Sequence, residues 1–332
     1  MMALPAFRLM KPVSLTEALS TLAENPGALP VAGGTDLLVS MKQGLFNPTH
    51  LVDLKGVPDL QRIDISEHGV WLGACLRLSE LRDHSEIRRR YTALSEAANL
   101  VASPPLQNRG TLGGNICLDT RCWYYNQSAF WRHSLGYCLK REGNICRVVP
   151  GSKRCYATFS SDTVPALIAL GARVKLAGWH EGALTEREFP LEDFFVEDGI
   201  RRNVLRPGEV LVGLRLPPAQ AIRSGYRKYR QRASIDYPLV SIAVALRIAE
   251  GKLENVRVVV GALASAPVLA VETMAVLEGS RPTPDLLGRA AEFVTKRTRP
   301  VKNQASSPAH RRHMARVLCR RLLEQIVMAP GA

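Results

Sequence analysis

Four cysteines in a polar, aromatic segment are the side chains best suited to do chemistry in this chain of 332 residues. Cys122, Cys138, Cys146 and Cys155 are separated by 15, 7 and 8 residues. No pair shows the Cys-x-x-Cys spacing typical of structural zinc, which disfavours zinc but leaves it open. Four thiolates suit a [4Fe–4S] cluster, and unliganded core thiols are the third alternative. The spacing favours the cluster.

The segment around these cysteines, residues 116–159, has the character of an insertion. It holds four of the eight tyrosines and two of the four tryptophans, yet it shows neither helical nor strand periodicity. More than forty residues without regular structure are unusual in a compact domain unless something else holds them together. A metal cluster bound by the four cysteines would do so.

Two glycine-rich motifs could hold an anionic ligand. Residues 33–36, Gly-Gly-Thr-Asp, follow a predicted strand at 29–32 and precede a predicted helix at 37–42. Glycines let the backbone approach a ligand, and the free amides at a helix start favour a pyrophosphate. The second motif, residues 109–115, places Gly110, Gly113 and Gly114 within one short window. The first motif lacks the Gly-x-Gly-x-x-Gly spacing of a dinucleotide-binding fingerprint, and a plain turn with an N-cap is the alternative for it.

Composition bounds the class of protein. Apolar residues make up 46% and charged residues 22%, as in an ordinary globular protein, and no apolar run is long enough for a membrane span. No export signal is visible at the N-terminus, so we expect a cytoplasmic protein. Seven cysteines, an odd number, argue against a disulfide framework.

The net charge of +14 requires that nucleic-acid binding be considered. The basic residues are spread along the chain, and their densest cluster, at 310–321, lies on a helical pattern with leucines on its other face. No helix-turn-helix, zinc-finger or RNA-binding signature is present. The cluster is therefore interpreted as a solvated helix face, with a docking surface for an acidic protein as the alternative.

The elements that must position these motifs divide the chain into three units. Residues 1–60 have the pattern of a small α/β unit. Residues 61–219 combine strands at 61–65, 70–75 and 172–176 with helices at 79–83, 91–100 and 163–170, and carry the insertion 116–159. Residues 220–332 are predicted to form an α+β unit with strands at 228–232, 241–248 and 253–260, followed by helices at 271–277, 284–295 and 309–328.

Together these motifs resemble a known family. Residues 31–37, 110–116, 161–162 and 165–170 are similar to the FAD-binding subunits of the xanthine dehydrogenase family of molybdenum hydroxylases, over nearly the whole chain. The resemblance implies an α+β fold: a two-part FAD-binding domain of the vanillyl-alcohol-oxidase/p-cresol-methylhydroxylase type, then a C-terminal domain with a three-stranded sheet. The cysteine-bearing insertion, with the runs 121–128 and 138–141, looks like that of the β subunits of 4-hydroxybenzoyl-CoA reductases.

The resemblance assigns roles to individual residues. It implies that FAD is held by one set of residues and a [4Fe–4S] cluster by another. The FAD set comprises Ala32, Gly33, Gly34, Thr35, Asp36, Leu37, Ser103, Thr111, Gly114, Asn115, Asp162 and Lys228. Within this set, Asp162 would bond the adenosine ribose. The cluster set comprises Cys122, Cys138, Cys146 and Cys155. The resemblance assigns no residue of this chain a catalytic role at the substrate.

The resemblance also implies a function as an electron-transfer subunit. The partners would be a molybdopterin-binding large subunit and a small subunit with two [2Fe–2S] clusters, in a dimer of heterotrimers. The implied reaction, on the large subunit, is reductive dehydroxylation of 4-hydroxybenzoyl-CoA in anaerobic aromatic degradation, with ferredoxin as the electron donor. The alternatives are an ordinary hydroxylase flavin subunit that passes electrons to NAD or a quinone, and, from another class, a basic zinc-containing binding module.

Overall fold

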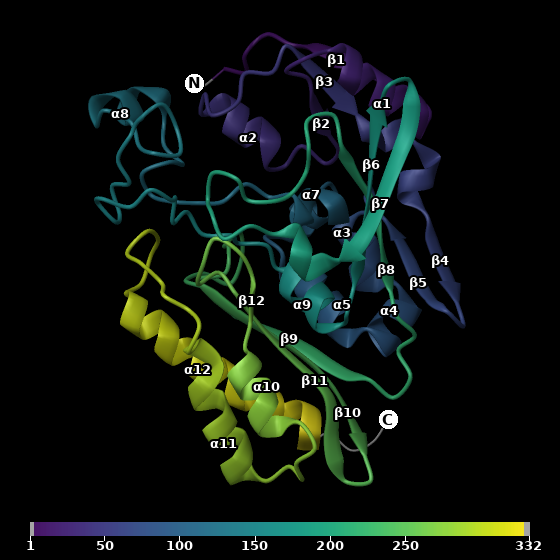
Figure 1. Cartoon of the computed structure of the whole chain (residues 1–332), viewed down its shortest axis with the longest axis vertical. Coiled ribbons are helices and arrows are strands. Elements are labelled where there is room, and N and C mark those ends of the chain that lie inside the picture. The colour runs from purple at the N-terminus through teal and green to yellow at the C-terminus, as the bar shows by residue number, and fades with distance from the viewer. Residues whose placement is uncertain (1–2, 329–332) are drawn as a thin grey trace.

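The computed structural model describes residues 3–328, which form three units, each built on its own sheet (Figure 1). The N-terminal unit has a parallel sheet of order β1-β3-β2, and the short loops beside it carry the first glycine motif. Its elements are β1 (Arg8–Met10), α1 (Leu15–Glu24), β2 (Leu29–Val31), α2 (Leu37–Lys42) and β3 (His50–Asp53), followed by the 3-10 helices η1 (Leu54–Gly56) and η2 (Pro58–Gln61).

The middle unit is an antiparallel sheet of order β4-β5-β8-β6-β7 with helices packed on it. Its strands are β4 (Ile63–Ser66), β5 (Gly69–Gly73), β6 (Arg173–His180), β7 (Ala183–Pro190) and β8 (Val210–Leu216). Its helices are α3 (Leu78–Asp83), α4 (Ser85–Arg90), α5 (Thr92–Leu100), α6 (Pro104–Gln107), α7 (Leu112–Ile116), α8 (Ala129–Ser134), α9 (Thr163–Ala169) and η3 (Leu191–Phe194).

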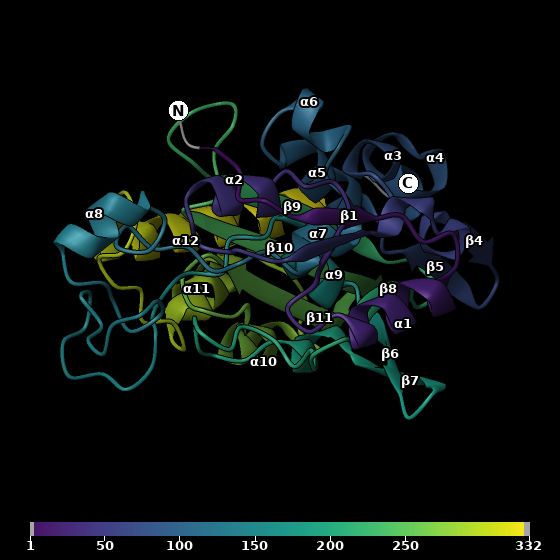
Figure 2. The same ribbon diagram turned by 90° about the horizontal axis from the view of Figure 1, so that it is seen from above.

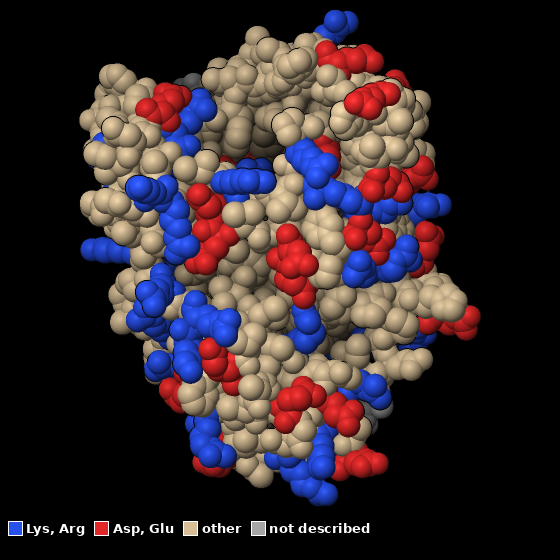
Figure 3. Space-filling model, viewed as in Figure 1, with Lys and Arg blue, Asp and Glu red and all other residues tan. Residues whose placement is uncertain are grey.

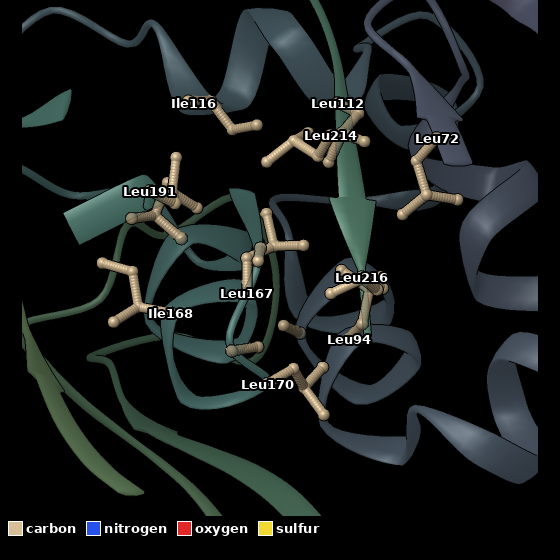
Figure 4. Packing of buried hydrophobic residues seen from close by; sticks show 14 of the residues in the cluster. Leu72, Leu94, Leu112, Ile116, Leu167, Ile168, Leu170, Leu191, Leu214 and Leu216 are labelled. Atoms are coloured by element: carbon tan, nitrogen blue, oxygen red, sulfur yellow. The ribbon is translucent and has the colours of Figure 1, made fainter. Parts of the chain in front are cut away.

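The core of the middle unit anchors the second glycine motif. Leu112 and Ile116 of α7 are fully buried and point toward Leu167, Leu214 and their neighbours (Figure 4). Burying such a side chain contributes about 1.5–3 kcal/mol. Because the two apolar residues flank Gly113 and Gly114, this packing fixes the position of the glycines.

The C-terminal unit has an antiparallel sheet of order β12-β11-β10-β9, with helices packed against it (Figures 1 and 2). Four strands replace the three predicted, because a two-residue strand pairs with β11 at Val259 and Val260. The elements are β9 (Arg223–Tyr229), β10 (Val240–Ala249), β11 (Lys252–Gly261), β12 (Val268–Leu269), α10 (Val271–Leu277), α11 (Pro284–Glu292), η4 (Phe293–Thr295) and α12 (Pro308–Met328). None of the described helices is long and apolar enough to cross a membrane.

Several short elements were not predicted. Ser103 is extended, as expected of a residue before proline, but Pro104 then begins α6, since a proline fits the first turn of a helix. The glycine motif at 112–116 is helical rather than only a turn, and β7 lies in a segment that showed no clear pattern. The insertion has one helix, α8, and is otherwise irregular, as predicted.

Arg132 fastens the insertion to the N-terminal unit. Its side chain is buried, and its guanidinium donates hydrogen bonds to the carbonyl oxygens of Gln43 (3.0 Å) and Gly44 (3.1 Å) just beyond α2. It also bonds to the carbonyl of Gln127 within the insertion. The side chain therefore joins two segments that are far apart in sequence.

We expect Arg132→Ala to loosen the insertion without unfolding the three units. The variant leaves these carbonyl groups without their donor, which costs roughly 1–3 kcal/mol of local stability. Limited proteolysis should cut within residues 116–159 several times faster than in the wild type. Ser134→Ala, an exposed change on the same helix, is the control and should leave the cleavage rate unchanged; equal rates for both variants would contradict the role of Arg132.

Candidate cofactor site

A cavity of about 900 Å³ lies where the N-terminal and middle units meet, and both glycine motifs line it. The space-filling view shows a hollow between the N-terminal unit and the rest of the chain (Figure 3). Ten of the twelve residues predicted to bind FAD line this cavity. They are Ala32, Gly33, Gly34, Thr35, Asp36, Leu37, Thr111, Gly114, Asn115 and Asp162.

The first glycine motif has the backbone geometry that an anion site requires. Gly34 has a φ of +70°, which favours glycine. The amide of Leu38 donates to the carbonyl of Gly34, so the helical turn begins here. The amides of Thr35, Asp36 and Leu37 have no hydrogen-bond acceptor within residues 3–328, as is usual for a first turn. These three residues line the cavity, so their amides are available to a pyrophosphate.

The two motifs are in direct contact through Gly33. A Cβ at this position would lie 2.1 Å from the carbonyl oxygen of Arg109 and 2.9 Å from the Cα of Gly110. Both obstacles are backbone atoms, which cannot move aside as a flexible side chain can. Any other residue at position 33 would therefore force the motifs apart.

We expect Gly33→Ala to weaken FAD binding and to destabilise the fold by about 1–3 kcal/mol, as overpacking does. The measurements are FAD per polypeptide after gel filtration and the midpoint of urea unfolding. Gly288→Ala is the matched control, because a Cβ there meets nothing within 4 Å and the position lies inside α11. The control should be neutral or slightly stabilising; full FAD occupancy in Gly33→Ala would contradict the assignment.

Asn115 ties the second motif to the segment that follows the insertion. Its Oδ1 accepts hydrogen bonds from the Ser161 hydroxyl (2.7 Å), the Thr163 hydroxyl (2.7 Å) and the Thr163 amide (3.2 Å). Thr111 caps α7 through its hydroxyl, which accepts from the Gly114 amide at 3.2 Å. The predicted site residues on either side of the insertion are thus joined directly, although 45 residues separate Asn115 from Ser161.

Asp162 lies at the cavity wall in a buried ion pair. Its carboxylate accepts a hydrogen bond from the Tyr226 hydroxyl (2.6 Å) and lies 3.1 Å from the ammonium of Lys228. The two charged side chains are 3% and 1% exposed. Burial raises the pKa of Asp162, and the charge of Lys228 acts against that shift. Asp162 therefore already has two protein partners, and its predicted bond to the adenosine ribose stays a prediction.

Ser103 and Lys228 are the two predicted residues outside the set that lines the cavity. Lys228 also donates to the carbonyl groups of Leu100 (2.6 Å) and Asp236 (3.0 Å). It therefore holds the loop after β9 in place, and that loop carries Ile235 and Tyr237 onto the cavity wall. The structure supports an indirect role for Lys228 at the cavity.

Sequence reasoning missed Asp119 on the cavity wall and Arg121, which contacts two residues that line the cavity. Arg121 pairs with Asp36 of the first motif and lies over the ring of Tyr237, at 4.1 Å. Asp119 lines the same cavity. Arg121 stands next to Cys122 in a run already noted, but its partners come from residues 85 and 116 positions away, and no local pattern indicates them.

The four cysteines of the insertion are brought into one region. Burial raises the pKa of the Cys122 thiol to about 12, and the other three thiols contribute to that rise, so all four lie within electrostatic range. The amide of Ala157 donates to the Cys155 Sγ at 3.3 Å. Amide hydrogen bonds to sulfur are among the features that set the potential of iron–sulfur clusters.

In residues 3–328 no group of three or more Cys, His, Asp or Glu side chains has the geometry of a metal site. The donor set itself fits an iron–sulfur cluster: four thiols, three of them buried, with an amide donor on Cys155. The ends of the insertion are held together by paired backbone hydrogen bonds of 2.7 Å between Arg121 and Thr158. Ligation by the four cysteines stays a prediction.

Comparison with known families decides the class of the cavity. The family model described as "FAD binding domain in molybdopterin dehydrogenase" matches residues 5–219, and "CO dehydrogenase flavoprotein C-terminal domain" matches residues 225–326. The chain belongs to the FAD-binding subunits of the molybdenum hydroxylase family. The predicted fold class and the prediction of FAD as a cofactor are confirmed.

Individual relatives agree with this assignment. The FAD-binding subunit PaoB of an aldehyde oxidoreductase from Escherichia coli is 37% identical over 70% of this chain and 74% of its own length. The medium chain of carbon monoxide dehydrogenase from Afipia carboxidovorans is 26% identical over 96% of each chain. A carbon monoxide dehydrogenase structure from Hydrogenophaga pseudoflava superimposes with a TM-score of 0.80 at 25% identity, over the full length of both chains.

Proposed function

We propose that this chain is the electron-transfer subunit of a molybdenum enzyme complex and holds two redox cofactors, FAD in the cavity and a [4Fe–4S] cluster on Cys122, Cys138, Cys146 and Cys155. FAD exchanges one or two electrons and the cluster exchanges one, so together they join unlike electron carriers. The observations that support the proposal are the cavity lined by both glycine motifs and, for the cluster, four cysteines in one insertion whose ends are paired between Arg121 and Thr158.

The residues of this chain have distinct tasks in that function. The first motif offers its free amides to the pyrophosphate, and Thr111 and Asn115 line the same cavity. Arg121 bonds to Asp36 at the point where the insertion leaves the cavity, so the cysteine loop begins at the FAD site itself. No residue here acts on the substrate, which we propose to be bound by a molybdopterin-containing partner, with [2Fe–2S] clusters on a smaller one, in a dimer of heterotrimers.

The more specific proposal is a subunit of a 4-hydroxybenzoyl-CoA reductase type of complex with ferredoxin as donor. It is supported by the cysteine insertion and by the similarity of residues 121–128 and 138–141 to those subunits. The basic surface supports it as well, because Lys and Arg side chains gather along the side formed by the insertion and α12 (Figure 3). Such a surface suits an acidic electron-carrier protein.

A second candidate is the FAD subunit of an aldehyde oxidoreductase, which the 37% identity to PaoB favours. In this case electrons leave the substrate and pass out to an acceptor such as NAD or a quinone. The two candidates differ in substrate and in direction of electron flow, and both require FAD in the same cavity.

The deciding experiment is to purify the complex from its native host by a tag on this chain. Its ultraviolet–visible spectrum should show flavin bands over a broad iron–sulfur absorption, and a colourless chain would refute the proposed function. The complex is then assayed with 4-hydroxybenzoyl-CoA and reduced ferredoxin, and separately with aromatic aldehydes and NAD or a quinone. Activity in only one assay selects between the candidates.

A further inference from the structure

A buried polar network connects the wall of the FAD cavity to the cysteine loop, and neither glycine motif belongs to it. Its centre is Asp119, which lines the cavity and is 6% exposed. Lys140, two residues after Cys138, reaches back to Asp119 with an Nζ–Oδ1 distance of 2.7 Å. The Lys140 side chain is 5% exposed, so its charge is almost entirely removed from water.

The remaining contacts of the network satisfy these two charges. Asp119 accepts a hydrogen bond from the Tyr125 hydroxyl at 2.7 Å, and the guanidinium of Arg202 lies 3.4 Å away. Lys140 donates to the hydroxyl (2.5 Å) and the carbonyl (3.1 Å) of Thr120. A buried pair with this many partners holds its geometry well, whereas removing one partner leaves an uncompensated charge.

The network extends to Cys155. The Thr120 hydroxyl donates to the carbonyl of Gly199 at 2.7 Å, and the Gly199 amide donates to the carbonyl of Cys155 at 2.9 Å. A Cβ on Gly199 would lie 2.7 Å from the Cys155 Sγ, so the backbone is packed against the sulfur. The Lys140 ammonium therefore belongs to the same hydrogen-bonded network as the Gly199 backbone that packs against the Cys155 sulfur.

We propose that Lys140 is a positioning residue between the two cofactor sites: through Asp119 and Thr120 it fixes the cysteine loop against the wall of the FAD cavity, and it keeps one buried positive charge in the network that packs against Cys155. The inference rests on the proposed [4Fe–4S] cluster. Reduction of a cluster adds one negative charge, so a fixed positive charge nearby favours the reduced state. Lys140 would thereby set the potential at which electrons enter or leave this subunit.

The test uses the full chain with its cofactors and three variants. Lys140→Met removes the charge, and Lys140→Arg keeps it. Lys153→Met is the matched control, because it removes a charge from an exposed position of the same loop, two residues from Cys155. Iron and FAD are counted per chain, and the midpoint potential of the cluster is measured by a redox titration followed by electron paramagnetic resonance.

We expect Lys140→Met to retain FAD and to show a more negative cluster potential than the wild type. At a fixed potential its ratio of reduced to oxidised cluster should fall roughly tenfold, equal to about 59 mV for one electron. Lys140→Arg should recover most of the shift, and Lys153→Met should match the wild type. If Lys140→Met loses its iron, recovery of iron and potential in Lys140→Arg supports the role, and loss in both variants overturns it.

Two other outcomes separate this inference from the function on which it rests. A wild-type chain that holds FAD but no iron overturns the proposed cluster and this inference together. A wild-type chain with iron, and a Lys140→Met variant with the same iron content and the same potential, overturns only the role of Lys140.

Discussion

Replacing Cys138 by serine is expected to remove the iron–sulfur signal from this chain while FAD stays bound. The expected loss is large, because a hydroxyl is a poor substitute for one of four thiolate ligands. Cys138 is 8% exposed and lies in the part of the loop between residues 135 and 147, away from the glycine motifs in sequence. FAD should remain because Cys138 does not line the cavity.

The measurement is iron and FAD per polypeptide, together with the low-temperature paramagnetic resonance spectrum of the reduced protein. Cys319→Ala is the control, because this cysteine lies on the buried face of α12 in the C-terminal core, far from the loop in sequence. The control should keep its full iron content. Unchanged iron in Cys138→Ser would show that this thiol is not a ligand.

Replacing Lys228 by methionine should have the largest effect on stability. The change leaves Asp162 with its charge, 3% exposed, and without the ammonium that now lies 3.1 Å away. Breaking one side of a buried ion pair typically costs about 3–5 kcal/mol. The variant also loses the bonds to Leu100 and Asp236, so the loop that carries Tyr237 to the cavity should become mobile.

The stability that Lys228→Met loses should increase as the pH rises from mild acid to neutral. Burial already raises the pKa of Asp162, and removal of Lys228 raises it further, because Lys228 opposes that shift. Between the ordinary carboxyl pKa of the unfolded chain and the raised pKa of Asp162 in the folded variant, only the folded variant keeps this proton bound. The unfolding free energy of the variant therefore falls as the pH rises through that range. The difference from the wild type should be smallest in mild acid and largest near neutral pH.

Urea unfolding of both proteins across this pH range provides the measurement. The double variant Asp162→Asn with Lys228→Met is the informative control, because it removes the unpaired charge as well as its partner. It should recover part of the lost stability and lose the added pH dependence. An equal deficit at every pH would show that the cost of Lys228→Met is packing rather than charge.

Local sequence determined the regular elements and the cofactor class. The helices at 271–277, 284–292 and 308–328 and the long strands β10 and β11 follow from apolar periodicity, which reflects burial of one face. The glycine motifs could also be found from sequence, since only glycine fits where two backbones approach as closely as at Gly33. Short elements such as α6 and β12 were missed, because so few residues carry too little pattern.

The tertiary structure alone decided how the motifs work together. Asn115 bonds across the insertion to Ser161 and Thr163, Arg121 pairs with Asp36, and Lys140 reaches Asp119. Each of these contacts joins segments at least twenty positions apart, and polar pairs of that kind leave no periodic trace in the sequence. Spacing favoured the four cysteines as ligands of a cluster, which stays a prediction; only the fold shows that a buried aspartate at the cavity wall pairs with a buried lysine of the cysteine loop.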